Sequence, residues 1–146
     1  MEKQQQTWGK LLKYFRQKKK LKQDEVAVGL CTPSYLSRIE NGIVIADYSL
    51  YEQLFANLNI DFSNLKHDIS EHTAFLECVY EKLLTNLPVS ESDIERLTIL
   101  MQNEYSIELQ IMAKLIYSRY LFSIKEDTEA RKLLNEIEPL VSWKKD

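Results

Sequence analysis

The stretch from Gln23 to Gly42, QDEVAVGLCTPSYLSRIENG, constrains the fold of this chain more than any other. Thr32 can cap a helix with its side-chain hydroxyl, and Pro33 suits the first helical position, where a backbone N–H would have no partner. Gly42 suits the left-handed residue that often follows a last helical turn. The stretch therefore predicts a short helix over residues 23–29, a tight turn, and a second helix over residues 33–40.

Apolar residues recur at helical spacing both before and after this stretch. The sequence contains only three glycines and three prolines, which leaves little material for strands and turns. We therefore predict an all-α chain. Its further helices are expected over residues 7–20, 49–58, 68–87, 90–101, 107–124 and 127–139, with Thr7, Asp68, Ser90 and Asp127 as N-terminal caps.

Two domains are expected, over residues 1–65 and 66–146. Ile60, Phe62 and Leu65 would close the core of the first, which has four to five helices. The four antiparallel helices of the second would form two hairpins, because their starts recur after 36 to 38 residues. That period is near the tetratricopeptide repeat, although its diagnostic residues are mostly absent. Since such arrays need about three repeats, either a partner subunit supplies the missing cover or the chain stops short of a longer array.

The segment over residues 107–124 is apolar almost all round, so it needs cover on more than one side. Core or dimer packing is the first interpretation, and a groove for a ligand is the second. The candidate residues for a dimer or ligand surface are Ile111, Leu115, Tyr117, Tyr120 and Phe122.

Charge is distributed unevenly along the chain. Residues 1–38 contain nine Lys or Arg and three acidic residues, a balance of +6, whereas the whole chain carries −3. The remaining residues must therefore carry −9. A basic end favours contact with phosphates. The alternative is that Lys18, Lys19 and Lys20 are a solvated helix end, well placed against the helix dipole.

The sequence carries no pattern for catalysis, metal binding or export. It has no glycine-rich phosphate loop, no HExxH and no Ser or Cys nucleophile motif beside a histidine, so we predict no enzyme and no cofactor. Neither Cys31 and Cys78 nor His67 and His72 have metal-ligand spacing, so no metal is expected. Without a long apolar run or a signal core, a reduced, cytoplasmic setting without membrane contact is expected.

Several residues of the 23–42 stretch resemble those of a known family. The phage-repressor (Xre/Cro) type of helix-turn-helix is similar at Gln23, Ala27, Thr32, Ser34, Leu36, Ser37, Arg38, Ile39, Glu40, Asn41 and Gly42. The variant GLCT at 29–32, followed by YLSRIENG at 35–42, resembles the Rgg/PlcR-like regulators of Gram-positive bacteria. Those regulators carry tetratricopeptide-like helices after this domain and often act as dimers that bind small peptides. The resemblance covers about residues 1–62 and is looser beyond. It implies a bacterial, sequence-specific transcription regulator that binds an operator in double-stranded DNA as a homodimer.

The same resemblance implies roles for individual residues, with the third helix in the major groove. Base contacts would come from Pro33, Ser34, Ser37 and Arg38. Contacts to the DNA backbone would come from Lys20, Lys22, Gln23, Thr32, Tyr35 and Asn41, although Tyr35 could equally pack within the domain and Gln23 could also reach a base. Arg16 and Glu40 match a structural ion pair that ties the first helix to the third.

Two departures from the family pattern affect DNA binding. Pro33 stands where many relatives place a polar residue, so it offers only an apolar contact, such as to a thymine methyl group. Residues 43–47, IVIAD, lack the basic side chains that often follow this glycine. The competing hypothesis is a protein- or peptide-binding module, such as an anti-repressor, antitoxin or peptide-responsive adaptor, that uses the helix-turn-helix as a scaffold.

Overall fold

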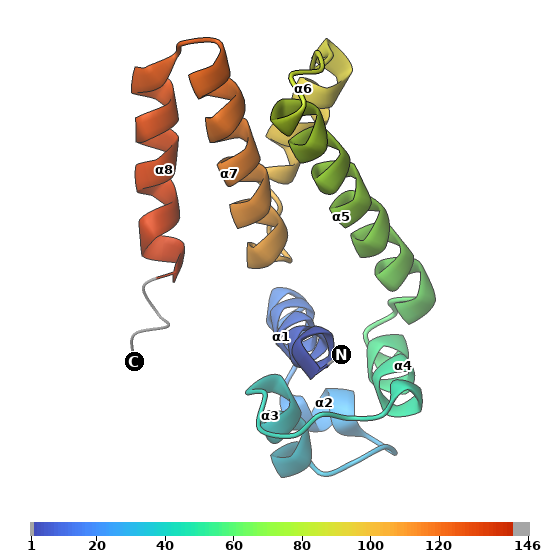
Figure 1. Cartoon of the computed structure of the whole chain (residues 1–146). Helices are drawn as coiled ribbons and strands as arrows, with labels where there is room; N and C mark the ends of the chain where they lie inside the picture. The colour runs from blue at the N-terminus through green and yellow to red at the C-terminus, as the bar shows by residue number, and fades with distance from the viewer. Residues whose placement is uncertain (1, 142–146) are drawn as a thin grey trace. The chain divides into compact units, whose positions relative to one another are not determined.

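The computed structural model describes the backbone of residues 2–141 and the side chains of residues 8–141. Within this range the chain is all-helical, as predicted, with eight helices and no strand (Figure 1). The helices are α1 (Glu2–Lys18), α2 (Gln23–Ala27), α3 (Pro33–Glu40), α4 (Tyr48–Asn57), α5 (Phe62–Leu84), α6 (Glu91–Leu100), α7 (Ile107–Ser123) and α8 (Asp127–Val141).

The chain divides into two compact units, residues 1–68 and 69–146. Helix α5 contributes its first turns to the first unit and the rest to the second. The predicted helix start at Asp68 is therefore wrong, because Asp68 lies inside α5. The helix starts at Phe62 instead, and the carboxylate Oδ1 of the preceding Asp61 accepts a hydrogen bond from the backbone N–H of Asn64 at 3.2 Å.

Other predicted helix ends also differ from the structure, α5 for example ending at Leu84 rather than at residue 87. Helix α1 begins at Glu2 rather than at Thr7, since the Glu, Lys and Gln residues before Thr7 are good helix formers. Helix α2 ends at Ala27, two residues early, because Gly29 adopts a left-handed φ of +76°. Helix α8 continues through Pro139 to Val141, so this proline lies in the last turn and does not end the helix.

The core of the first unit lies between α1, α2, α3, α4 and the start of α5. Phe62 is buried there, stacks on Phe55 with ring centroids 5.0 Å apart, and meets Trp8 edge-on at 5.2 Å. Leu65 is buried as well, whereas Ile60 is only partly buried, so the prediction that these residues close the core is confirmed for Phe62 and Leu65. Its other fully buried apolar side chains include Leu11, Leu12, Val26, Leu36, Ile39, Tyr51, Leu54 and Leu58.

Helices α1 and α3 cross closely at Gly9. A Cβ atom built on Gly9 would lie 2.1 Å from the backbone carbonyl oxygen of Ile39. Only a glycine permits this approach, which sets how deeply α3 sits against α1.

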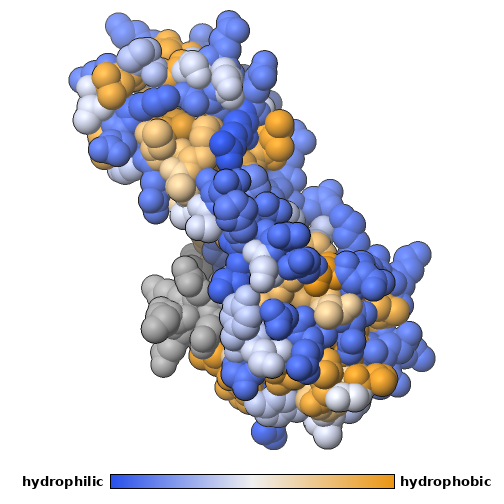
Figure 2. Space-filling model, turned by 90° about the vertical axis from the view of Figure 1, so that its right-hand side faces the viewer, coloured by the Kyte–Doolittle hydropathy of each residue, from blue (hydrophilic) through white to orange (hydrophobic). Residues whose placement is uncertain are grey.

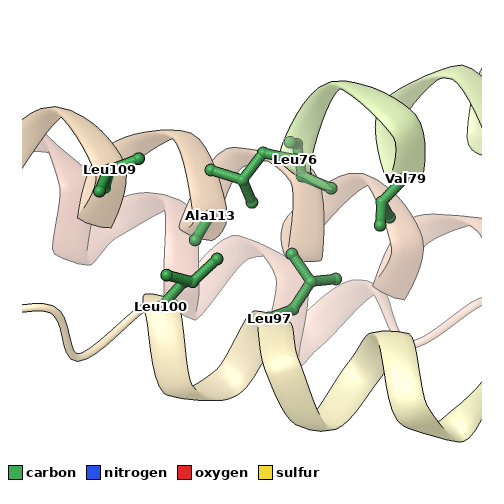
Figure 3. Packing of buried hydrophobic residues seen from close by; sticks show 7 residues of the cluster. Leu76, Val79, Leu97, Leu100, Leu109 and Ala113 are labelled. Carbon is green, nitrogen blue, oxygen red and sulfur yellow. The ribbon is translucent and has the colours of Figure 1, made fainter. Parts of the chain in front are cut away.

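The core of the second unit is shared by α5, α6 and α7 (Figure 3). Its members are Leu76 and Val79 from α5, Leu97 and Leu100 from α6, and Leu109, Ala113 and Ile116 from α7. A smaller cluster of Leu121, Ala130 and Leu133 joins α7 to α8, which run antiparallel side by side (Figure 1). Helix α7 thus packs on more than one side, as its apolar sequence predicted.

An ion pair links α5 to α6. Lys82 Nζ donates to Asp93 Oδ2 at 2.8 Å, and this hydrogen bond lowers the pKa of Asp93. Asp93 also accepts from the backbone N–H of Ser90, whose own Oγ accepts from the N–H of Asp93 at 3.1 Å. The predicted cap at Ser90 is therefore confirmed.

Candidate nucleic-acid interface

Both ends of α3 are capped by the residues that the sequence predicted. Thr32 Oγ1 accepts a hydrogen bond from the backbone N–H of Tyr35 at 3.1 Å, and Pro33 occupies the first turn. At the other end Gly42 has a φ of +76°, and the N–H of Ile43 reaches back to the carbonyl of Arg38 at 2.9 Å. These caps satisfy backbone groups that a short helix leaves unpaired.

Helix α3 has one buried face and one exposed face. Leu36 and Ile39 are fully buried, which holds the helix against the core. The four predicted base-contacting residues lie away from that core: Pro33, Ser34 and Arg38 are exposed, and Ser37 is partly exposed. The Tyr35 side chain is 37% exposed, which fits both of its predicted roles, a contact to the DNA backbone and packing within the domain.

A buried ion pair fastens the end of α3 to α1. Arg16 Nε and Nη2 donate to the two carboxylate oxygens of Glu40 at 2.7 and 2.9 Å, in the bidentate geometry that suits an arginine and a carboxylate. The Glu40 side chain is 1% exposed, and the pair raises the pKa of Arg16. Arg16 Nη1 also donates to the carbonyl of Leu21 at 3.0 Å. The structural pair that the resemblance implied is therefore present.

Gln23 joins this pair, which the sequence did not indicate. Its Nε2 donates to Glu40 Oε1 at 3.0 Å, so α1, α2 and α3 meet at one carboxylate. The sequence also did not indicate a second hydrogen bond between helices, in which Asn57 Nδ2 on α4 donates to the backbone carbonyl of Val26 on α2 at 2.7 Å. Glutamine and asparagine both occur in helices, and no local sequence pattern indicates a hydrogen-bond partner 17 or 31 residues away.

Removing the carboxylate at position 40 should destabilise the first unit far more than an ordinary surface change. Glu40→Ala leaves Arg16 and Gln23 facing a buried site without their acceptor, which we expect to cost about 3–5 kcal/mol. The measurement is urea unfolding followed by circular dichroism. Glu52→Ala, on the exposed face of α4, is the matched control. Equal loss in the two variants would contradict a structural role for the pair.

Comparison with known families agrees with this geometry. Residues 12–65 match the family model described as Helix-turn-helix. The match covers just over a third of the chain, from the middle of α1 to the first turn of α5, and so includes α2, α3 and α4 whole. Searches of curated proteins and of solved structures gave no match. In the part of the chain that the structure describes, no helix is long and apolar enough to cross a membrane.

The lysines beside the helix-turn-helix differ in what they contact. Lys18 Nζ donates to the hydroxyl of Tyr14 at 3.2 Å, and Lys19 Nζ donates to the carbonyl of Leu58. Lys20 follows α1 in a left-handed conformation, with a φ of +58° and an exposed side chain. Lys22, also exposed, precedes α2 and donates its backbone N–H to Glu25. The structure therefore leaves Lys20 and Lys22 as exposed candidates for the predicted contacts to the DNA backbone.

The remaining predicted backbone contacts lie at the two ends of α3. Thr32 is exposed but uses its Oγ1 as the helix cap. Asn41 is exposed at the other end, and its Nδ2 approaches Ser37 Oγ at 3.5 Å. In the loop after the helix-turn-helix, Asp47 Oδ1 accepts from the N–H of Leu50 at 2.8 Å and caps α4, so this acid has a structural role.

The five apolar residues predicted as a dimer or ligand surface differ in their exposure. Leu115 and Phe122 are 48% and 40% exposed. Tyr117 and Tyr120 stack on each other with ring centroids 5.9 Å apart, and both pack against the smaller cluster of Leu121, Ala130 and Leu133. Ile111 is partly buried. A sequence that is apolar all round gives no means of separating these faces.

Among the described residues, no group of three or more His, Cys, Asp or Glu side chains is arranged to hold a metal ion. Cys31 is partly buried in the turn before α3, and burial raises the pKa of its thiol. The site therefore consists of an exposed face of α3, two exposed lysines beside it, and a polar network that fastens α3 to α1 and α2.

Proposed function

We propose that this chain is a sequence-specific DNA-binding regulator of transcription that acts as a homodimer in the cytoplasm of a bacterium. The observation that carries the proposal is α3, a helix capped at both ends, with one face buried and Ser34, Ser37 and Arg38 on the other. A single helix fits the major groove, which is about 12 Å wide and presents base edges to polar side chains.

The polar network beneath α3 supports this function because recognition needs a rigid helix. Arg16, Gln23 and Glu40 fasten the C-terminal end of α3 to α1 and α2. Arg38, two residues before Glu40, then presents its guanidinium from a fixed backbone. An arginine in this setting can donate two hydrogen bonds to a guanine, the commonest specific contact in the major groove.

Phosphate contacts would position the helix, and Lys20 and Lys22 are their best candidates. Replacing both with alanine should weaken binding to every duplex alike and lower the salt slope of log K by about 2, since each lost phosphate contact removes about one released counterion. Fluorescence anisotropy over a series of salt concentrations measures both effects. Lys132→Ala, on the exposed surface of α8, should leave affinity and slope unchanged. A change in specificity with an unchanged slope would contradict this assignment.

The small surface that one recognition helix buries on DNA favours a homodimer. A single module of this kind buries about 600–1,000 Å² on DNA, and dimers reach two half-sites about 34 Å apart. The second unit, which lies outside the matched family, is the part available to join two copies.

The direct test is a selection of bound sequences from random DNA, followed by anisotropy on the selected operator and a scrambled duplex. Tight binding to the operator at physiological salt supports the proposal. Binding that ignores sequence and disappears at physiological salt favours the competing hypothesis, in which the helix-turn-helix is a scaffold and the second unit binds a protein or a peptide.

A further inference from the structure

We propose that Asn41 is a modification site, at which the side-chain amide is lost to give aspartate or isoaspartate whenever the last turn of α3 opens. The modified chain binds its operator weakly, because Asn41 directly follows the recognition helix. This consequence for DNA rests on the proposed function, whereas the chemistry does not.

The chemistry begins with the dipeptide Asn41-Gly42. Asn41 is the only asparagine in the sequence that is followed by a glycine. In such a pair the backbone nitrogen of the glycine can attack Cγ of the asparagine, because glycine has no side chain to obstruct the approach. The new N–Cγ bond closes a succinimide ring, and the amide nitrogen leaves as ammonia with the proton that the attacking nitrogen gives up. Water then opens the ring at either of its carbonyl groups, which yields aspartate or isoaspartate.

The side chain of Asn41 is accessible to this reaction. It is exposed, and its Nδ2 lies 3.5 Å from Ser37 Oγ, at the long limit of a hydrogen bond. Water is also at hand, since hydrophilic residues surround separate apolar patches on the face of the molecule that Figure 2 displays. The surroundings of the amide group therefore give it little protection.

The folded backbone around Asn41 prevents the attack instead. The Asn41 ψ of 2° turns the nitrogen of Gly42 toward the backbone nitrogen of Asn41, away from the side chain that it has to reach. The N–H of Gly42 donates to the carbonyl of Ile39 at 3.1 Å. The next N–H, that of Ile43, donates to the carbonyl of Arg38 at 2.9 Å. Rotation about this ψ moves both N–H groups and breaks both hydrogen bonds, so ring closure requires the last turn of α3 to open.

Both sides of Asn41 are fixed to the core of the first unit. On one side, the buried carboxylate of Glu40 accepts three hydrogen bonds from side chains of α1 and α2. On the other side, Ala46 is buried and donates its backbone N–H to the hydroxyl of Tyr51 at 3.4 Å. Since neither side is free to follow a rotation at Asn41, the turn opens only when one of them is released.

Either product changes the end of the recognition helix. Aspartate adds a negative charge, which is unfavourable at the C-terminal end of a helix and repels the phosphates of DNA. Isoaspartate also brings its Cβ into the main chain, so the hydrogen bonds donated by Gly42 and Ile43 no longer fit. Both products lack the amide donor that the family resemblance assigned to the DNA backbone.

The first test measures the fraction of Asn41 converted over time in the full chain at mildly alkaline pH, by peptide mapping with mass spectrometry. The folded wild type should react at least about tenfold more slowly than the same chain unfolded in guanidinium chloride, because the folded turn is rarely open. Glu40→Ala should react at least about tenfold faster than the folded wild type, since it releases one side of Asn41.

Two further variants complete the series. Gln23→Ala removes one of the three hydrogen bonds to the Glu40 carboxylate and should react faster than the wild type by a smaller factor. It carries the comparison if Glu40→Ala does not fold, which circular dichroism shows. Glu52→Ala, on the exposed face of α4, is the matched control and should react like the wild type.

The second test follows the consequence for DNA by fluorescence anisotropy. Asn41→Asp should raise the operator dissociation constant about tenfold, and added salt should reduce the difference from the wild type because it screens the new charge. On storage, the wild type should lose operator affinity in step with the conversion of Asn41. Asn41→Gln should keep the affinity with which it starts, because the longer side chain of glutamine closes a ring far more slowly.

Equal conversion in the folded and the unfolded wild type would overturn the inference. The same holds if Glu40→Ala and Gln23→Ala both fold and react no faster than Glu52→Ala. Wild-type operator affinity in Asn41→Asp would refute the consequence for DNA. A wild-type chain that discriminates no operator refutes the proposed function and that consequence together, while the conversion rates still decide whether α3 protects Asn41.

Discussion

Gly9→Ala should unfold the first unit or destabilise it by more than about 3 kcal/mol. The new methyl group would lie 2.1 Å from the carbonyl oxygen of Ile39, a backbone atom that cannot turn aside as a side chain can. Helices α1 and α3 would have to separate, and overpacking that moves backbone costs about 1–3 kcal/mol or more. Separation would also pull Arg16 away from Glu40, which adds the loss of that pair.

The measurement is urea unfolding followed by the fluorescence of Trp8, which contacts Phe62 edge-on in the core of the first unit. A Trp143→Phe background makes Trp8 the only tryptophan that reports. The matched control is Gly29→Ala. No atom lies within 4 Å of a Cβ there, and only its φ of +76° opposes the change, at about 1–2 kcal/mol. If Gly29→Ala destabilises the unit more than Gly9→Ala does, the close crossing is not what requires Gly9.

Arg38→Ala should sharply lower the discrimination between the operator and a scrambled duplex. A bidentate contact to one base pair contributes about 1–3 kcal/mol of discrimination, and Arg38 is the only charged side chain on α3 that is exposed. Its loss removes the strongest candidate base contact, while the buried residues that hold α3 stay unchanged. Anisotropy with both duplexes at one salt concentration measures the ratio of affinities.

Arg38→Lys is the informative companion variant. Lysine keeps the positive charge but lacks the planar fork, so it should retain affinity for both duplexes and recover little discrimination. Unfolding of each variant should match the wild type, because only the backbone carbonyl of Arg38 takes part in the helix cap. Unchanged discrimination in Arg38→Ala would show that α3 is not the recognition helix.

The bounds of α3 were predictable because local chemistry sets both of its ends. Thr32, Pro33 and Gly42 act within one turn of the residues they cap, so their effect is visible in the sequence. The start of α5 was not predictable in the same way. Residues 68–71 form an acceptable start signal, and so does Asp61; the stacking of Phe62 on Phe55 favours the earlier one.

The candidate site was likewise predictable where local patterns act and not where distant residues meet. The resemblance implied base contacts from Ser34 and Arg38, and the structure leaves both exposed while Leu36 and Ile39 of the same helix are buried. The sequence did not indicate that Gln23 donates to Glu40, or that Asn57 donates to Val26, because these partners lie 17 and 31 residues apart. It also gave no means of telling the exposed Leu115 and Phe122 from the partly buried Tyr117 and Tyr120.

The sequence by itself therefore determined the helical class of this protein and the ends of α3. Those properties depend on periodicity and on caps, which act over three or four neighbouring residues. Only the tertiary structure decided why position 9 is a glycine, how one buried carboxylate joins three helices, and which apolar side chains remain exposed. Those properties depend on how helices cross, and a crossing brings together atoms whose distance no local pattern contains.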